Sequence, residues 1–186
     1  MDRRSRRTRQ TLHETLMQLV VERGYDAISV SDIVGAANVG RSTFYAHFTD
    51  KDDLLRDLAD TLRGVLVSEH ALVAAAAEAP DGRVLGFSRF MTRHMQEQHQ
   101  LYQALMQGRA GPIILGNIRH ALCDIVRKEL PADAGPNREL TVQFLVGAYL
   151  SVLTWWLNRG ATEAPEQIEA AFRELAVRGL SQEGQP

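Results

Sequence analysis

The sequence predicts an all-α protein in two parts, a small amino-terminal unit of three helices and a larger helical domain. Apolar residues recur at helical spacing through most of the 186 residues, and the strand-type alternation of apolar and polar residues is missing. Glycine and proline separate the apolar stripes at 108–112, 131–136 and 160–165. Hydrophobic residues make up 45% of the chain, which is enough to build a substantial core.

The first two helices are predicted from apolar spacing and capping residues. Leucine and valine side chains recur at helical spacing over 5–23, and Gly24 follows as a helix stop. Ser29 and Asp32 stand three residues apart and resemble a capping box, in which each side chain accepts from the other residue's backbone N–H. Because an apolar stripe follows, the sequence predicts a second helix of about nine residues after Ser29.

A tight turn is predicted at 37–40, between the second and third helices. Asn38 tolerates left-handed backbone geometry, and Gly40 can begin the next helix. The third helix is expected over 41–48, where Phe44 and Phe48 share one face at i,i+4 spacing. These two rings are predicted to pack on the first two helices, which leaves the polar side chains of the third helix outside.

The rest of the chain is predicted to continue as helices. A fourth helix begins after Asp50 and closes at the alanine run 74–77. The domain division predicted from this pattern is 1–50 for the three-helix unit and 51–186 for the helical domain. Further helices are expected over about 83–100, 101–108, 112–130, 137–159 and 165–179.

Positive charge is concentrated at the amino terminus, although the formal net charge of the chain is -2. Residues 1–51 carry eight Lys and Arg against six Asp and Glu, whereas the remainder carries thirteen against seventeen. Five arginines fall between Arg3 and Arg9. This distribution favours a nucleic-acid partner for the amino-terminal unit, and a solvated or frayed terminus is the alternative.

Three helices with a four-residue turn before the last one form a helix-turn-helix, whose last helix enters the major groove of DNA. Arg41 can donate two hydrogen bonds to a guanine edge, and Tyr45 and His47 can donate to phosphate oxygens. Ser29 and Lys51 stand at helix starts, where backbone N–H groups favour phosphate. Taken singly, each of these residues is also compatible with a solvated helix face. The predicted DNA-binding residues are Ser29, Arg41, Ser42, Thr43, Tyr45, His47 and Lys51.

Two segments, GYDAISVSDI at 24–33 and ANVGRSTFYAHFTDKDDLL at 37–55, closely resemble the DNA-binding signature of the TetR/AcrR family. The resemblance implies that the predicted residues other than Ser42 occupy DNA-contacting positions, with Tyr45 and Lys51 as typical phosphate contacts. The sequence departs from the family pattern at two turn positions. Asn38 replaces a common glycine, and Gly40 replaces a common serine or threonine. Because Gly40 has no side chain to cap the third helix, we expect some loss of DNA affinity but no change of fold.

The last two predicted helices are expected to form a homodimer interface. Residues 142–157 are apolar nearly all round, so this helix must be covered on both sides, and one chain offers few helices to do so. The carboxy-terminal region also resembles that of many family members, which implies a four-helix bundle across the dimer axis. An ordinary central core helix is the alternative. The predicted interface residues are Phe144, Ala148, Tyr149, Val152, Phe172 and Leu175.

An effector pocket is predicted between about residues 83 and 130, where large, adaptable and partly polar side chains gather. Methionines and aromatic rings suit an apolar ligand, and a few polar groups fix its orientation. Ordinary core packing is the alternative at each position. The predicted pocket residues are Phe90, Met91, His94, Met95, Tyr102, Met106 and Cys123.

Enzyme, metal and cofactor sites are not expected. The sequence has no phosphate-cradling glycine loop, no nucleophile elbow and no carboxylate or histidine cluster at ligand spacing. The lone Cys123 leaves no intramolecular disulfide, which fits the cytoplasm. No signal peptide is expected, and 142–157 is shorter than the ~20 residues of a bilayer span, so we expect no membrane partner.

Together with these patterns, the resemblance implies a transcriptional regulator of the TetR type that binds a palindromic operator in double-stranded DNA as a homodimer, and family habit favours a repressor. A small-molecule effector is expected to release it from DNA. The alternative is an architectural DNA-binding protein without effector control, although the acidic remainder of the chain argues against purely electrostatic binding.

Overall fold

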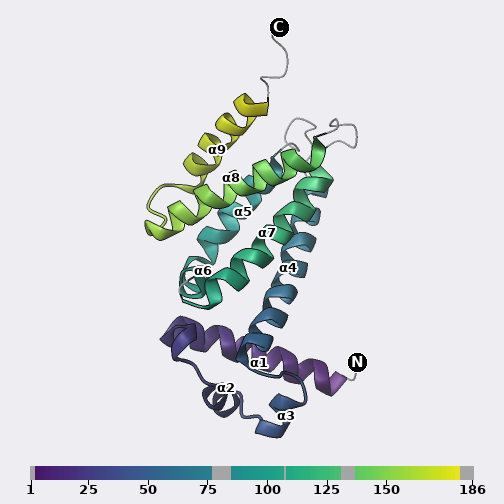
Figure 1. Ribbon diagram of the computed structural model, residues 1–186, viewed down its shortest axis with the longest axis vertical. Helices are drawn as coiled ribbons and strands as arrows, with labels where there is room; N and C mark the ends of the chain where they lie inside the picture. Colours follow the sequence, from purple (N-terminus) through teal and green to yellow (C-terminus); the bar gives the residue numbers. More distant parts are fainter. Residues whose placement is uncertain (1–2, 77–84, 107, 131–136, 181–186) are drawn as a thin grey trace. The chain divides into compact units, whose positions relative to one another are not determined.

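The computed structural model describes residues 3–76, 85–106, 108–130 and 137–180, and every regular element within these ranges is a helix (Figure 1). The all-α prediction is therefore confirmed. The chain divides into two compact units that do not follow a single cut in the sequence. The amino-terminal unit holds residues 1–63 and 100–117, and the carboxy-terminal unit holds residues 64–99 and 118–186. The predicted functional boundary after residue 50 stays a prediction.

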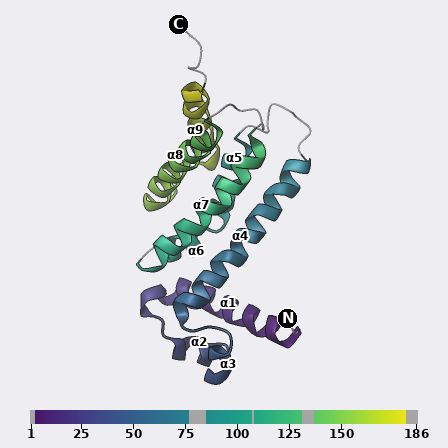
Figure 2. The same cartoon turned by 45° about the vertical axis from the view of Figure 1, so that its right-hand side comes forward.

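The amino-terminal unit combines the predicted three-helix unit with parts of later helices (Figure 2). Its interior is formed by side chains that the sequence placed on apolar stripes, among them Leu16, Ile33 and Leu55, which are fully buried. Its elements are α1 (Arg3–Arg23), a 3₁₀ helix η1 (Tyr25–Ala27), α2 (Val30–Ala36), α3 (Arg41–Tyr45), the first half of α4 (Lys51–Ala76), most of α6 (His99–Met106) and the start of α7 (Ala110–Glu129).

The capping box and the turn around α2 have the predicted geometry. The Ser29 hydroxyl accepts from the backbone N–H of Asp32, and the Asp32 carboxylate accepts from the backbone N–H of Ser29. Asn38 takes the left-handed conformation at φ 51°, which confirms the predicted turn. Gly40 is the N-cap of α3 and makes no side-chain capping bond, as expected. The four-residue turn thus depends on a backbone conformation that few residues adopt.

Several helix ends differ from the prediction for simple reasons. α1 begins at Arg3, so the arginine run is part of the helix rather than a frayed terminus. α3 ends at Tyr45, three residues before the predicted end. Pro112 lies inside the first turn of α7, where the missing N–H has no intrahelical acceptor to lose and the helix is not broken. The short helix η1 was not predicted.

The carboxy-terminal unit contains α5 (Gly86–Glu97), α8 (Arg138–Asn158), α9 (Pro165–Leu180) and the remaining parts of α4 and α7. Phe87, Tyr149 and Phe172 from α5, α8 and α9 form a buried aromatic cluster, with ring centroids 5.0–6.0 Å apart in edge-to-face geometry. The Tyr149 hydroxyl is 2.8 Å from the hydroxyl of Thr92 and also donates to the carbonyl of Ser88. The buried hydroxyls of Tyr149 and Thr92 are thereby satisfied.

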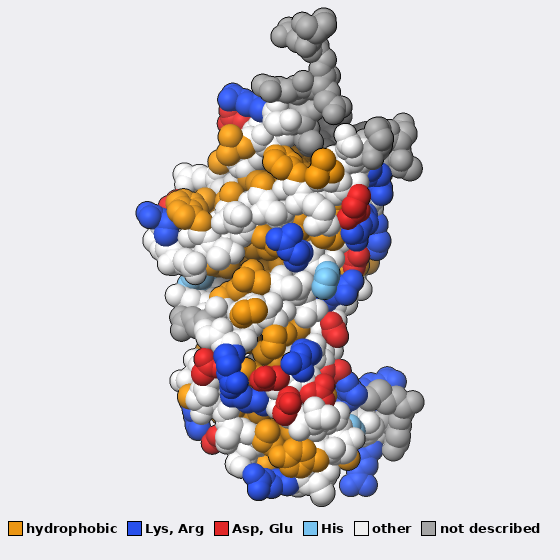
Figure 3. All heavy atoms as spheres, in the orientation of Figure 1, with side chains coloured by type: hydrophobic (Ala, Val, Ile, Leu, Met, Phe, Trp, Pro, Cys, Tyr) orange, Lys and Arg blue, Asp and Glu red, His pale blue; other side chains and the backbone are white. Residues whose placement is uncertain are grey.

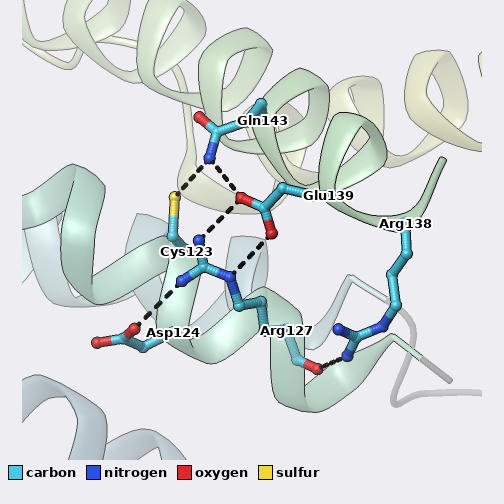
Figure 4. A network of polar contacts seen from close by, with 6 residues as sticks. All are labelled: Cys123, Asp124, Arg127, Arg138, Glu139 and Gln143. Atoms are coloured by element: carbon cyan, nitrogen blue, oxygen red, sulfur yellow. Dashed lines mark hydrogen bonds and ion pairs between the residues drawn. The ribbon is translucent and has the colours of Figure 1, made fainter. Parts of the chain in front are cut away.

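Polar contacts join α7 to the start of α8 (Figure 4). The Arg127 guanidinium donates from Nε and Nη2 to the two carboxylate oxygens of Glu139, at 3.1 and 2.9 Å. Gln143 donates to Glu139 and to the sulfur of Cys123. The hydrogen bonds from Arg127 and then from Gln143 lower the pKa of Glu139 to about 2. Because the pair is exposed, we regard it as a guide to helix orientation rather than a main source of stability.

The left-handed turn generates a stability prediction. Asn38→Ala should lower the free energy of unfolding by about 1 kcal/mol relative to Asn38→Gly, because alanine has neither glycine's freedom nor asparagine's local hydrogen bonding at positive φ. Urea titration of the two variants measures the difference. Equal stability of the alanine and glycine variants would contradict the assigned backbone conformation.

Candidate DNA-binding surface

The recognition helix α3 is held by one buried ring and presents polar side chains around it. Phe44 is fully buried, and its ring centroid lies 5.8 Å from that of Phe48. The side chains of Arg41 and Ser42 are exposed, and Tyr45 is 55% exposed. Thr43 and His47 are half-buried. The structure therefore leaves Arg41, Ser42 and Tyr45 accessible, and Thr43 and His47 partly so.

An open groove of about 370 Å³ lies beside this surface. One wall comes from α3 and the turn after it, including three of the predicted DNA-binding residues. The other wall comes from the first two turns of α1. The lining residues are Arg4, Ser5, Thr8, Ser42, Thr43, Ala46 and His47.

Arg41 is positioned by the preceding helix. Its Nη2 donates to the hydroxyl of Ser31 on α2, at 2.8 Å. A guanidinium carries five N–H donors in a planar fork, so this single bond leaves donors for a base edge. The contact links the exposed side of α2 to the first residue of α3 and restricts the direction of the Arg41 side chain.

Lys51 uses its ammonium group inside the protein. Nζ donates to the carbonyls of Tyr25 at 2.9 Å and Ile28 at 2.6 Å, and lies 4.4 Å from the centre of the Tyr25 ring. Desolvation, followed by the positive charge of Arg109, lowers the pKa of Lys51. Two of its three N–H donors thus hold η1 and the segment before α2.

Ser29 also has an internal role. Its hydroxyl is shared with Asp32 in the capping box at the start of α2. The hydrogen bonds from Ser29, the side-chain bond first and the backbone bond second, lower the pKa of Asp32. Asp32 therefore stays ionised near neutral pH and complements the positive amino-terminal end of α2.

A cluster that sequence reasoning missed ties α1 to α4 beneath the DNA-binding surface. Asp57 of α4 accepts from Arg9, and its second oxygen is 2.8 Å from Nε2 of His13. The Arg9 guanidinium also lies 5.1 Å from the centre of the Phe48 ring. Burial is the main cause that lowers the pKa of His13. The i,i+4 spacing of Arg9 and His13 places both side chains on one face of the helix, and this was the sequence signal for a shared acidic partner.

A second missed contact joins residues 83 positions apart within the amino-terminal unit. The backbone N–H and the Nε of Arg109, before α7, donate to the carboxylate of Asp26 in η1. The neighbouring Tyr25 hydroxyl donates to Asp52 at the start of α4. Burial and this bond raise the pKa of Tyr25 well above its usual value. Sequence spacing carries no signal for such a distant pair.

The predicted dimer residues fall on two sides of α8 and α9. Phe144 is 52% exposed and Leu175 is 68% exposed, while Ala148 and Val152 are half-buried. Tyr149 and Phe172 instead lie in the interior of the same chain, in the aromatic cluster with Phe87. Their hydrogen bonds and ring contacts are already made within one protomer, so they are not part of an exposed surface.

Further exposed apolar side chains extend this surface along α8. Leu140 and Trp155 share the helix face of Phe144 and are also exposed. Hydrophobic side chains gather over the α8 and α9 part of the face drawn in Figure 3. Among the helices of the described residues, α8 alone is long and apolar enough to cross a membrane, and 44% of its most apolar window is buried.

The predicted effector residues are distributed over both units. Met91, Met95 and Cys123 are buried in the carboxy-terminal unit, where Phe90 and His94 are half-buried. Tyr102, which is buried, and the half-buried Met106 belong to the amino-terminal unit.

Phe90 and His94 lie in a mixed aromatic and polar cluster. Their rings stack with centroids 6.1 Å apart, and the ring of His70 meets Phe90 edge-on. His70 is 2.8 Å from a carboxylate oxygen of Glu129, whose other oxygen has no hydrogen-bond partner in the described part of the chain. Burial is the main cause that lowers the pKa of His94.

A cavity of about 370 Å³ in the carboxy-terminal unit is lined by none of the predicted effector residues. Its walls come from α5 and α9, and both charge signs are present. No group of three His, Cys, Asp or Glu side chains in the described residues is arranged to hold a metal ion. The lining residues are Gly86, Arg89, Thr92, Arg93, Pro165, Glu166, Glu169 and Arg173.

Three helices packed around a buried apolar core, with a polar recognition helix exposed, define the helix-turn-helix class of DNA-binding proteins. Comparison with known families agrees. Residues 13–58 match the family described as bacterial regulatory proteins, tetR family, and residues 85–177 match a transcriptional regulator C-terminal region. The chain belongs to the TetR family of transcriptional regulators. The recognition made from the sequence is confirmed.

Individual relatives support the same family and fold. The HTH-type transcriptional regulator YxbF of Bacillus subtilis (strain 168) is 31% identical over 77 residues, which is 41% of this chain and 20% of that protein. The matched part thus spans about a fifth of that relative.

Two solved structures share the fold over nearly the whole chain. A TetR-family regulator from Syntrophomonas wolfei str. Goettingen is 19% identical with a TM-score of 0.74, covering 92% of this chain and 96% of that one. FadR from Bacillus subtilis, in complex with stearoyl-CoA, is 18% identical with a TM-score of 0.69, covering 91% and 98%.

The internal role of Lys51 can be tested by stability. Lys51→Met keeps the apolar stem but leaves two backbone carbonyls without their donor, so the free energy of unfolding should fall by about 1–3 kcal/mol. The matched control Lys128→Met, at an exposed position, should change it by less than about 0.5 kcal/mol. Urea unfolding measures both variants, and equal effects would argue against the capping role.

Proposed function

We propose that this TetR-family protein is a repressor that binds a palindromic operator in double-stranded DNA. The observation that carries the proposal is the exposed polar face of α3, anchored from behind by the buried Phe44. Arg41, oriented through Ser31, is assigned to a base edge, and Tyr45 to the phosphate backbone. We place the protein in the cytoplasm with no enzymatic role, in keeping with its family and with the free thiol of Cys123.

Selection of genomic DNA fragments with the purified protein tests this function. We expect a palindromic site with half-sites about 34–36 Å apart or somewhat wider, because two recognition helices must enter the groove from one side. Arg41→Ala should relax the preference at one base pair by about 1–3 kcal/mol, whereas Tyr45→Phe should weaken binding to all sequences alike. An unchanged selected motif for Arg41→Ala would remove its base-reading role.

The alternative function, an architectural DNA-binding protein, makes a different prediction in the same experiment. Purely electrostatic binding is indifferent to sequence and is lost steeply with salt. Recovery of unrelated fragments with no shared motif would favour that alternative.

We also propose that the protein acts as a homodimer through the exposed sides of α8 and α9. The surface consists of Leu140, Phe144 and Trp155 with the half-buried Ala148 between them on α8, and Leu175 on α9. A second copy would cover this apolar face, which accounts for the membrane-like composition of α8 without a membrane. Tyr149 and Phe172 are left out of the proposed interface, since they are buried within one chain.

Sedimentation of variants tests the dimer. Phe144→Arg should convert a dimer into a folded monomer at micromolar concentration, because it places a charge in the centre of the proposed apolar contact. Leu72→Arg is the matched control, since Leu72 is an exposed large hydrophobic residue of α4 outside this surface, and it should remain dimeric. A monomeric unmodified protein would end the proposal.

Release by a small apolar effector is the third part of the proposed function. Its support is the group of methionine and aromatic side chains in α5, with Phe90 and His94 accessible beside the buried Met91 and Met95. The FadR proteins from Bacillus subtilis and Thermus thermophilus were solved with stearoyl-CoA and lauroyl-CoA. We therefore include acyl-CoA thioesters among the lipophilic compounds to be screened.

Thermodynamic linkage provides the test of release. A compound that raises the melting temperature should bind about 5–150-fold more weakly when operator DNA is present, and should weaken operator binding by the same factor. Titration calorimetry with and without the selected duplex measures both couplings. Compounds that bind near Phe90 and His94 but leave DNA affinity unchanged would show that control lies elsewhere.

A further inference from the structure

The arginines at the start of the chain have different roles once they are placed on α1. Arg9 contacts Asp57 and lies against the ring of Phe48, so it belongs to the interior support of the amino-terminal unit. The side chains of Arg3, Arg4, Arg6 and Arg7 are exposed. Because α1 is helical from Arg3 onward, these four point in directions that differ by about 100° per residue.

Only one of these exposed arginines lines the groove beside α3. Arg4 forms the α1 wall together with the next residue, Ser5, and with Thr8, which lies one helical turn after Arg4. Arg6 is two residues away, about 200° around the helix from Arg4, and does not line the groove. The fold therefore selects Arg4 from a run in which the sequence alone gives all arginines equal standing.

The groove has the chemistry of a phosphate-binding surface. Arg4 supplies a permanent positive charge, the side chains of Ser5, Ser42 and Thr43 supply hydroxyl donors, and the described lining includes no acidic side chain. The Thr8 hydroxyl is already donated to the backbone carbonyl of Arg4. The first turn of α1 contains no acidic residue, and the amino-terminal end of a helix carries a partial positive charge. An extended polyanion that offers only acceptors matches this set of donors.

The opposite wall identifies the class of polyanion. Ser42, Thr43 and His47 line the groove and belong to the surface proposed to enter the major groove of DNA. A sugar–phosphate strand borders every major groove, so a strand that flanks α3 must pass close to these residues. We propose that Arg4, with Ser5, binds the DNA backbone in this groove and forms a second phosphate contact on α1. This inference rests on the proposed DNA-binding function.

A matched pair of variants separates a groove contact from general charge. Arg4→Ala and Arg6→Ala each remove one exposed positive charge from α1, and alanine preserves the helix. The probe is the duplex recovered by selection with the unmodified protein, titrated by fluorescence anisotropy between about 50 and 200 mM salt. Arg4→Ala should weaken binding and reduce the slope of log K against log salt by about 0.9 per protomer. Arg6→Ala should leave most of the affinity and slope unchanged.

Neutral backbone substitutions identify the contact directly. Replacing single phosphates of the duplex by uncharged methylphosphonates should reveal a position at which the unmodified protein and Arg6→Ala lose affinity but Arg4→Ala does not. If Arg4→Ala retains the same sensitive positions as the unmodified protein, or if both variants lose equal salt slope, the inference is overturned. The proposed DNA-binding function would still stand in that case, provided that the unmodified protein binds the selected duplex. If the unmodified protein binds no duplex at all, both proposals fall.

Discussion

The packing of Phe44 and Phe48 against the interior of the amino-terminal unit is the interaction on which the DNA-binding surface depends. A five-residue helix such as α3 is too short to be stable alone, because nucleation costs more than its few hydrogen bonds return. Both rings are buried, and burial of a phenylalanine contributes about 1.5–3 kcal/mol. Arg9 lies over the face of the Phe48 ring while it contacts Asp57, so the same side chain that covers Phe48 also links α1 to α4. The groove between these helices follows from this arrangement.

A second set of contacts holds the approach to α2. Lys51 binds two carbonyls of the η1 region, Tyr25 contacts Asp52, and Arg109 contacts Asp26. These residues come from η1, the start of α4 and the segment before α7, all within one compact unit. Because α4 continues into the carboxy-terminal unit, Lys51 shares a helix with His70, whose ring contacts Phe90 of the proposed effector region. This continuity is the physical basis on which the proposed coupling rests.

In the carboxy-terminal unit, α8 is apolar on two sides for two different reasons. One side holds Tyr149 in the aromatic cluster, with its hydroxyl satisfied by Thr92 and Ser88. The other side carries Leu140, Phe144 and Trp155, each of which is about half exposed or more in the described part of the chain. A helix of this composition is explained either by a membrane or by a partner. The family membership and the helix-turn-helix favour the partner.

The sequence by itself determined the helical class, the order of the helices, the capping box at Ser29 and the left-handed turn at Asn38, because each depends on residues a few positions apart. It also indicated the exposed residues of α3, whose accessibility follows from the i,i+4 spacing of two buried rings. Only the tertiary structure decided which arginines are internal and which line the groove, and it alone assigned Lys51 to backbone carbonyls. It likewise decided that Tyr149 and Phe172 are interior. Those assignments depend on contacts between segments far apart in the sequence, as in the pair Asp26 and Arg109. Helical periodicity shows which face of a helix is apolar, but it does not show what covers that face.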